Sequence, residues 1–145
     1  MKEYTAVVAE DEPWIRRSIT RKITASSRPF RVVADTADGA HAAELVHDLG
    51  PDLLVTDIRM PERTGIEIAR ELKARYPGLQ VVIITGYDEF EYAREALRTG
   101  VVDFLVKPVG PEELEEALRR VEEALELEFA AADAQIEASL VDAQS

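Results

Sequence analysis

Five short apolar segments recur along the chain, and each is rich in valine, isoleucine or leucine. None alternates apolar with polar residues, as a strand with one solvent-facing side does. Continuous apolar runs are typical of strands in a parallel sheet that helices cover on both faces. The predicted strands are residues 5–9, 31–34, 53–56, 81–85 and 103–106.

Helical periodicity fills the segments between these strands. Ile15, Ile19 and Ile23 recur every four residues after Pro13, a residue well suited to a first helical turn. Similar patterns follow each later strand, and glycine or proline stands at nearly every boundary. The other predicted helices contain residues 42–49, 66–72, 90–97 and 114–125.

This alternation predicts one α/β domain: a flavodoxin-like, doubly wound (βα)5 fold with a five-stranded parallel sheet in the order 2-1-3-4-5. An eight-stranded (βα) barrel needs about 250 residues, and the chain has 145. The glycine-rich phosphate-binding motifs GxGxxG and GxxxxGK[ST] are missing.

The composition limits the cellular location and the kinds of site that this chain can have. The chain has no cysteine, which excludes disulfides, thiolate metal sites and a cysteine nucleophile. Its apolar runs are far shorter than the ~20 residues of a membrane span. The N-terminus, MKEYTAVVAEDE, has no signal-peptide pattern. We therefore expect a cytoplasmic protein with no membrane contact.

Negative charge is concentrated near the C-terminus. Residues 111–145 hold 11 acidic and 2 basic residues, a net charge of −9 out of −12 for the whole chain. The rest of the chain is nearly balanced and shows no basic stripe that could neutralise phosphates. We therefore expect no direct nucleic-acid binding by this chain.

Polar residues follow four of the five predicted strands. Glu10 and Asp11 follow the first strand, Asp57 the third and Lys107 the fifth, while Thr85 ends the fourth. In a doubly wound sheet the carboxyl ends of the strands share one edge, and ligands bind where the strand order reverses. The first and third strands are neighbours in the predicted order, so the three carboxylates should converge.

Converging carboxylates need a counter-charge. Two of them about 4 Å apart repel by roughly 4 kcal/mol at an effective dielectric near 20, so one is protonated or a cation lies among them. Mg²⁺ accepts such oxygen ligands and completes its shell with water and phosphate oxygens. With Lys107 and Thr85 nearby, the set suits phosphoryl transfer, with Asp57 as a possible nucleophile. Singly, each residue also has an ordinary explanation, such as helix capping.

Three stretches carry a family resemblance: VVAEDEP (7–13), DLLVTDIRMPERTG (52–65) and VVIITGYDEFEYAREALRTGVVDFLVKP (81–108). Together they resemble the receiver domain of two-component response regulators, over about residues 3–125. The stretch GYDEFEYAREAL is most similar to receivers linked to AraC-type DNA-binding domains. We therefore expect a receiver domain at residues 1–125 and a C-terminal helical extension or linker at 126–145.

The resemblance implies a role for each residue of the acidic site. Asp57 matches the phosphoacceptor. Glu10 and Asp11 match the acidic pair that holds Mg²⁺, for which Mn²⁺ can substitute, and the Arg59 backbone carbonyl is a further expected ligand. Glu10 stands where aspartate is commoner in the family, so a water molecule between it and the metal is one possible arrangement.

The resemblance also implies a switch. Thr85 matches the hydroxyl that turns toward the phosphoryl group, and Phe104 matches the switch aromatic. Lys107 matches the family lysine, and its bond to Pro108 is expected to be cis. Phe104 replaces the commoner tyrosine, so its movement must act through packing alone.

The function that follows is that of a phosphorylation-controlled signalling domain, not a turnover enzyme. From the resemblance we expect a sensor histidine kinase to supply the phosphoryl group. The surface formed by the helix at 90–97, the strand at 103–106 and the helix from Pro111 should then change. We expect homodimerisation as the readout and transcription as the output of a domain absent from this chain. One alternative is a single-domain response regulator that acts by protein–protein contact.

Another alternative is a phosphohydrolase with an aspartyl-phosphate intermediate. Such enzymes resemble DxD at the nucleophile, whereas Asp57-Ile58-Arg59 follows here. A phosphate-independent interaction module is a third possibility, although the full set of acidic residues, Thr85 and Lys107 argues against it.

Beyond Pro111 the sequence predicts one long helix, because alanine, glutamate and leucine dominate and no glycine or proline intervenes. Its second half carries an apolar stripe that would either fray or pair with a second chain. The negative charge opposes such pairing, so it should strengthen with salt. Two stripes follow one another, displaced by one position: Leu114, Leu118, Val121 and Leu125, then Phe129, Ala132, Ile136 and Leu140.

Overall fold

Strands and helices alternate in the computed structural model, which describes residues 2–86, 91, 94, 98 and 100–144. Each strand lies within two residues of its predicted bounds. The predicted helix at residues 90–97 falls outside the described residues. The elements are β1 (Tyr4–Ala9), α1 (Pro13–Ala25), β2 (Phe30–Thr36), α2 (Gly39–Leu49), β3 (Leu53–Asp57), α3 (Gly65–Arg75), β4 (Gln80–Thr85), β5 (Asp103–Val106) and α5 (Pro111–Gln144).

The five strands form one parallel sheet in the order β2-β1-β3-β4-β5, which confirms the predicted topology. The strand order reverses between β1 and β3. In the register of these two strands Ala9 lies opposite Thr56, so Glu10 and Asp57 emerge side by side at the carboxyl edge. Along the same edge, Thr85 pairs with Val106, the residue before Lys107.

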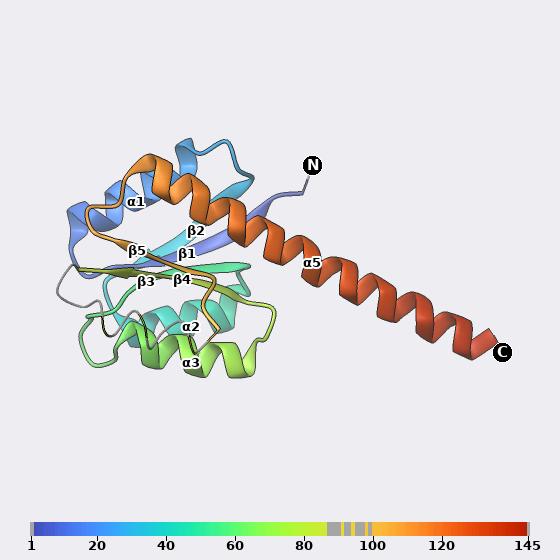
Figure 1. Ribbon diagram of the computed structural model, residues 1–145. Coiled ribbons are helices and arrows are strands. Elements are labelled where there is room, and N and C mark those ends of the chain that lie inside the picture. Colours follow the sequence, from blue (N-terminus) through green and yellow to red (C-terminus); the bar gives the residue numbers. More distant parts are fainter. Residues whose placement is uncertain (1, 87–90, 92–93, 95–97, 99, 145) are drawn as a thin grey trace.

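Helices cover both faces of the sheet, with α1 and α5 on one face and α2 and α3 on the other (Figure 1). Successive residues of β1 enter opposite layers of core. Ala6 and Val8 pack with the residues under α1 and α5, while Val7 and Ala9 pack with those under α2 and α3. Both sides of a central strand are therefore apolar, which explains the lack of alternation in the sequence.

The last helix is longer than the sheet it covers. α5 runs unbroken for 34 residues, and its C-terminal part projects away from the rest of the molecule (Figure 1). Leu125 is the last buried residue among the described side chains. The single long helix agrees with the sequence, whereas the division into domains at residue 125 stays a prediction. No described helix combines the length and apolar character needed to cross a membrane.

Candidate functional site

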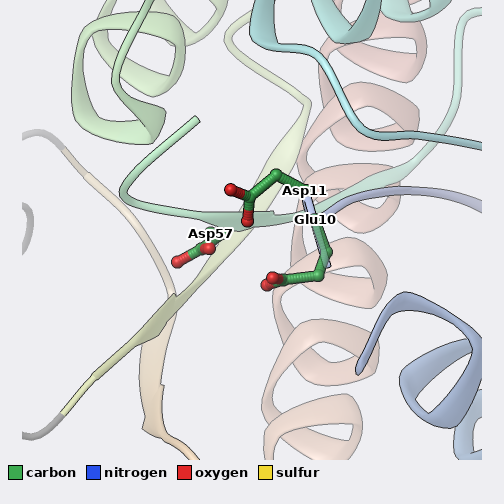
Figure 2. A group of neighbouring side chains, drawn as sticks. All are labelled: Glu10, Asp11 and Asp57. Atoms are coloured by element: carbon green, nitrogen blue, oxygen red, sulfur yellow. The ribbon is translucent and has the colours of Figure 1, made fainter. Parts of the chain in front are cut away.

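Three carboxylates meet where β1 and β3 end (Figure 2). One oxygen from each of Glu10, Asp11 and Asp57 lies within 4.8 Å of the others. Glu10 is fully buried and Asp57 is 3% exposed, whereas Asp11 faces solvent. The sequence prediction that these residues converge is therefore correct in the structure.

Lys107 supplies the counter-charge from the end of β5. Its Nζ lies 3.0 Å from Asp57 Oδ2 and 3.1 Å from Glu10 Oε2. Burial lowers the pKa of Lys107, but its hydrogen bonds to Asp57 and Glu10 and their charges outweigh burial, so the pKa is raised overall. The ammonium group thus stays charged and holds two carboxylates that would otherwise repel each other.

Glu10 is the carboxylate of the cluster whose charged form is disfavoured by its surroundings. Burial raises the pKa of Glu10 to about 7, the charge of Asp57 adds to the shift, and Lys107 opposes it. Its Oε1 accepts hydrogen bonds from the Glu12 amide and from the Lys107 ammonium, both at 3.2 Å, whereas its buried Oε2 has only the ion pair with Lys107 among the described residues. A buried carboxylate oxygen with a single ammonium partner, beside two other carboxylates, fits a hard divalent cation, which prefers oxygen ligands.

The backbone around Asp57 is tightly packed and needs a glycine. The Ile58 amide donates to Asp57 Oδ1 at 2.8 Å, and the Gly65 amide donates to the Ile58 carbonyl at 2.7 Å. A Cβ atom at Gly65 would lie 2.0 Å from the Asp57 carbonyl oxygen. Only glycine lets the start of α3 approach this closely, which fixes the strand end that carries Asp57.

The other predicted residues surround the cluster. Thr85 is fully buried, and its hydroxyl donates to the Gly86 carbonyl at 3.0 Å. Phe104 is half-buried against the core beneath α2 and α3. Arg59 follows β3 by two residues, so its carbonyl as a metal ligand stays a prediction. The Lys107–Pro108 peptide bond is cis, as expected.

The sequence reading missed the support that Arg16 gives to this edge. Its guanidinium donates to the Glu10 carbonyl at 2.8 Å and pairs with Asp35 at 3.2 Å. Arg16 thereby ties α1 and β2 to the loop that carries the acidic pair. The only feature of the sequence that could have indicated this role is the position of Arg16 on the buried side of the first helix. The other arginines of the same helix made it hard to single out.

Comparison with known proteins identifies this arrangement. The model of the response regulator receiver domain matches residues 6–119. The chain belongs to the response regulator receiver family. Members take part in two-component signalling and carry an acidic pocket that binds Mg²⁺, and in this chain Glu10, Asp11 and Asp57 form an acidic cluster.

Solved receiver structures share the fold. The receiver domain of AraT, a response regulator from Geobacillus stearothermophilus, superposes with a TM-score of 0.83 at 37% identity, covering 88% of this chain and 99% of that one. The receiver domain of the putative response regulator NarL from Mycobacterium tuberculosis gives a TM-score of 0.76 at 29% identity, covering 86% and 98%.

Curated relatives are longer than this receiver domain. The transcriptional regulatory protein DegU of Brevibacillus brevis is 36% identical over 115 residues, which are 79% of this chain and 48% of that protein. The chain spans about half the length of the curated relatives it matches. The match therefore concerns the receiver part of those proteins.

Proposed function

We propose that this receiver accepts a phosphoryl group on Asp57 from the phosphohistidine of a sensor histidine kinase. Receiver domains as a family are phosphorylated by such kinases. The observation that carries the proposal is the position of Asp57, which lies within 4.8 Å of two further carboxylates and 3.0 Å from the Lys107 ammonium. No other described Asp, Glu or His cluster has this composition.

The chemical step is a displacement at phosphorus. An Asp57 carboxylate oxygen forms the new O–P bond as the N–P bond of the phosphohistidine breaks, and the imidazole keeps the electron pair and takes up a proton. The Ile58 amide, bound to Oδ1, orients the carboxylate. Receiver domains are generally not enzymes, and we propose that chemistry here is limited to the chain's own phosphorylation and dephosphorylation.

Glu10, Asp11, Asp57 and the Arg59 carbonyl would hold Mg²⁺, or Mn²⁺ in its place, with Glu10 binding directly or through water. The bound cation would neutralise charge on the transferring phosphoryl oxygens. The Oε2 of Glu10, which accepts no hydrogen bond among the described residues and pairs only with the Lys107 ammonium, supports its inclusion in the set. Asp11, the exposed member, leaves the site open to solvent and to a phosphodonor.

The same residues provide a switch after phosphorylation. Lys107, now bound to Asp57 Oδ2, would pair with the new phosphoryl oxygens. The Thr85 hydroxyl, now bound to the Gly86 carbonyl, would turn toward the same group. That rotation changes the space next to Phe104, and the surface around β5 and α5 changes with it.

We propose that the switched surface promotes homodimerisation and that the output is control of transcription by a further domain. Two observations support this output. DegU is named a transcriptional regulatory protein, and the chain covers only 48% of it. The acidic composition of this chain also leaves DNA contact to another part of such a protein.

The acceptor is tested by replacing Asp57. Asp57→Asn should abolish labelling by acetyl phosphate, measured by intact mass and by Phos-tag electrophoresis. Asp48→Asn, the same change at an exposed site on α2, should be labelled like the unmodified chain. Undiminished labelling of Asp57→Asn would show that another residue accepts the phosphoryl group.

The metal is tested separately from the acceptor. EDTA should stop labelling, and Mg²⁺ or Mn²⁺ should restore it. Mg²⁺ should also raise the melting temperature of the unlabelled chain, because a ligand that binds only the folded state stabilises it. Asp11→Asn should lose most of that shift. Full labelling in metal-free buffer would contradict the proposed magnesium site.

A further inference from the structure

An apolar groove lies beside the acidic site, between α1 and the loop that joins β5 to α5. Its volume is about 370 Å³, and Trp14, Ile15, Ile19, Pro108 and Val109 form its apolar wall. Trp14, the single tryptophan of the chain, is 69% exposed here. We call this surface the α1 groove. A large aromatic side chain left this open marks a surface suited to a partner.

Positive charge lines the α1 side of the groove. α1 carries Arg16, Arg17, Arg21 and Lys22 and no acidic residue. Arg16 and Lys22 are engaged, with Asp35 and with the Val109 carbonyl. Arg17 and Arg21 are exposed beside Trp14 and form no ion pair with the described part of the chain. The groove is therefore apolar at its floor and basic along the rim that α1 forms.

The opposite surface occurs on the end of α5. Residues 126–144, which we call the α5 extension, carry five acidic residues and no basic one. Ile136 and Leu140 lie on it 59% and 57% exposed. Asp133 and Glu137, one turn apart, lie along one side of this apolar stripe. The α5 extension thus presents an apolar stripe with an acidic edge.

We propose that the α5 extension of one chain docks in the α1 groove of a second copy, with Ile136 and Leu140 against Trp14 and with Asp133 and Glu137 facing Arg17 and Arg21. The extension cannot reach its own groove, because α5 is continuous and points away from α1 (Figure 1). Pairing of two extensions would instead bring acid against acid. Charge complementarity selects α1 as the docking surface.

Docking of this kind is self-complementary, since each chain offers one groove and one extension. Two chains can satisfy both contacts in a closed, twofold pair. The contact requires no phosphoryl group and does not depend on the proposed function. Asp57→Asn should therefore leave it intact.

The first experiment uses the full chain and its own fluorophore. Sedimentation equilibrium should show self-association, and Trp14 emission should shift to the blue and become less accessible to acrylamide as concentration rises. Arg17→Glu with Arg21→Glu should weaken association by about tenfold or more, as expected for losing two charge contacts and gaining repulsion. Arg70→Glu with Arg75→Glu on α3, which lowers the net charge equally, should leave it unchanged.

The second experiment exchanges the charges. Asp133→Lys with Glu137→Lys should weaken self-association as the α1 variant does. A mixture of the two variants should recover it, because both contacts in the mixed pair then join opposite charges. Circular dichroism of each variant checks that it remains folded.

Three results would overturn the proposal. One is a wild-type chain that stays monomeric at every concentration. Another is unchanged association of the Arg17→Glu, Arg21→Glu variant. The third is the response to salt: docking on α1 must weaken as salt rises, whereas association of two acidic extensions must strengthen.

Discussion

The two halves of α5 belong to one unbroken helix, yet only the first is part of the core. In the first half an apolar face packs under the sheet; in the second, every described side chain from residue 126 to 140 is exposed. Alanine, leucine and glutamate dominate both halves, so local propensity is equally favourable. The difference shows that propensity forms this helix and the reach of the sheet decides what it buries. The buried residues of the first half are Leu114, Ala117, Leu118, Val121 and Leu125.

Length explains where burial stops. A strand of six residues, such as β1, spans roughly 20 Å at about 3.3 Å per residue. A helix covers that distance in about 13 residues at 1.5 Å each, which brings α5 from Pro111 to the region of Leu125. The last aromatic contact between α5 and the rest of the domain joins Phe129 to Tyr4 of β1; the two rings are stacked, with their centroids 6.4 Å apart. Beyond this pair no described strand lies under the helix.

The largest expected effect comes from replacing the same side chain in the two halves. Leu118 is 1% exposed and Leu127 is 72% exposed. Leu118→Ala should lower the free energy of unfolding by about 2–5 kcal/mol because it leaves a cavity. Leu127→Ala should change it by less than ~0.5 kcal/mol. Urea denaturation of a dilute chain measures both, and equal losses would mean that the two halves are packed alike.

The sequence predicted the part of the fold that rests on local pattern and topology. Apolar runs without alternation indicated the parallel sheet. Glycine and proline residues between the runs indicated where the described helices and strands begin and end. The site followed from one rule, that strand ends at a reversal of strand order share an edge. That rule brought Asp57 to Glu10 without any knowledge of distances.

Other features lie beyond sequence patterns because they depend on contacts between distant elements. The double role of Arg16 requires the separation of α1 from both Asp35 and the Glu10 carbonyl. The need for glycine at position 65 comes from how closely α3 begins behind Asp57. The apolar stripe of α5 continues past Leu125 with a shift of one position, so the stripe alone does not show where burial ends, and the boundary expected at residue 125 rested on the family resemblance.

An effect of intermediate size is expected at Phe129, through which the first turn of the α5 extension still contacts the folded domain. Its ring is 40% exposed, stacks on Tyr4 and lies under the Lys2 ammonium. Phe129→Ala should lower the free energy of unfolding by about 1 kcal/mol, the range of an aromatic pair at a partly exposed site. Ile136→Ala, further along the helix, should leave the monomer unchanged. Equal losses of stability at both positions would mean that the cooperatively folded domain extends past Phe129 to Ile136.

The smallest effect is expected from glycine in the α5 extension, and it separates helix formation from packing. Ala134→Gly should destabilise the local helix by about 1 kcal/mol, visible as lower helicity by circular dichroism on heating. The urea midpoint of the folded domain should not move, because residue 134 is exposed and lies nine residues beyond Leu125, the last buried residue among the described side chains. Ala117→Gly makes the same change where the methyl group is fully buried. It should lower the midpoint, since the backbone cost of about 1 kcal/mol now falls within the cooperative unit.

Both variants are compared at a concentration where the chain is monomeric. A midpoint lowered equally by Ala134→Gly would show that the extension unfolds with the folded domain, and the two halves of α5 would then be one energetic unit.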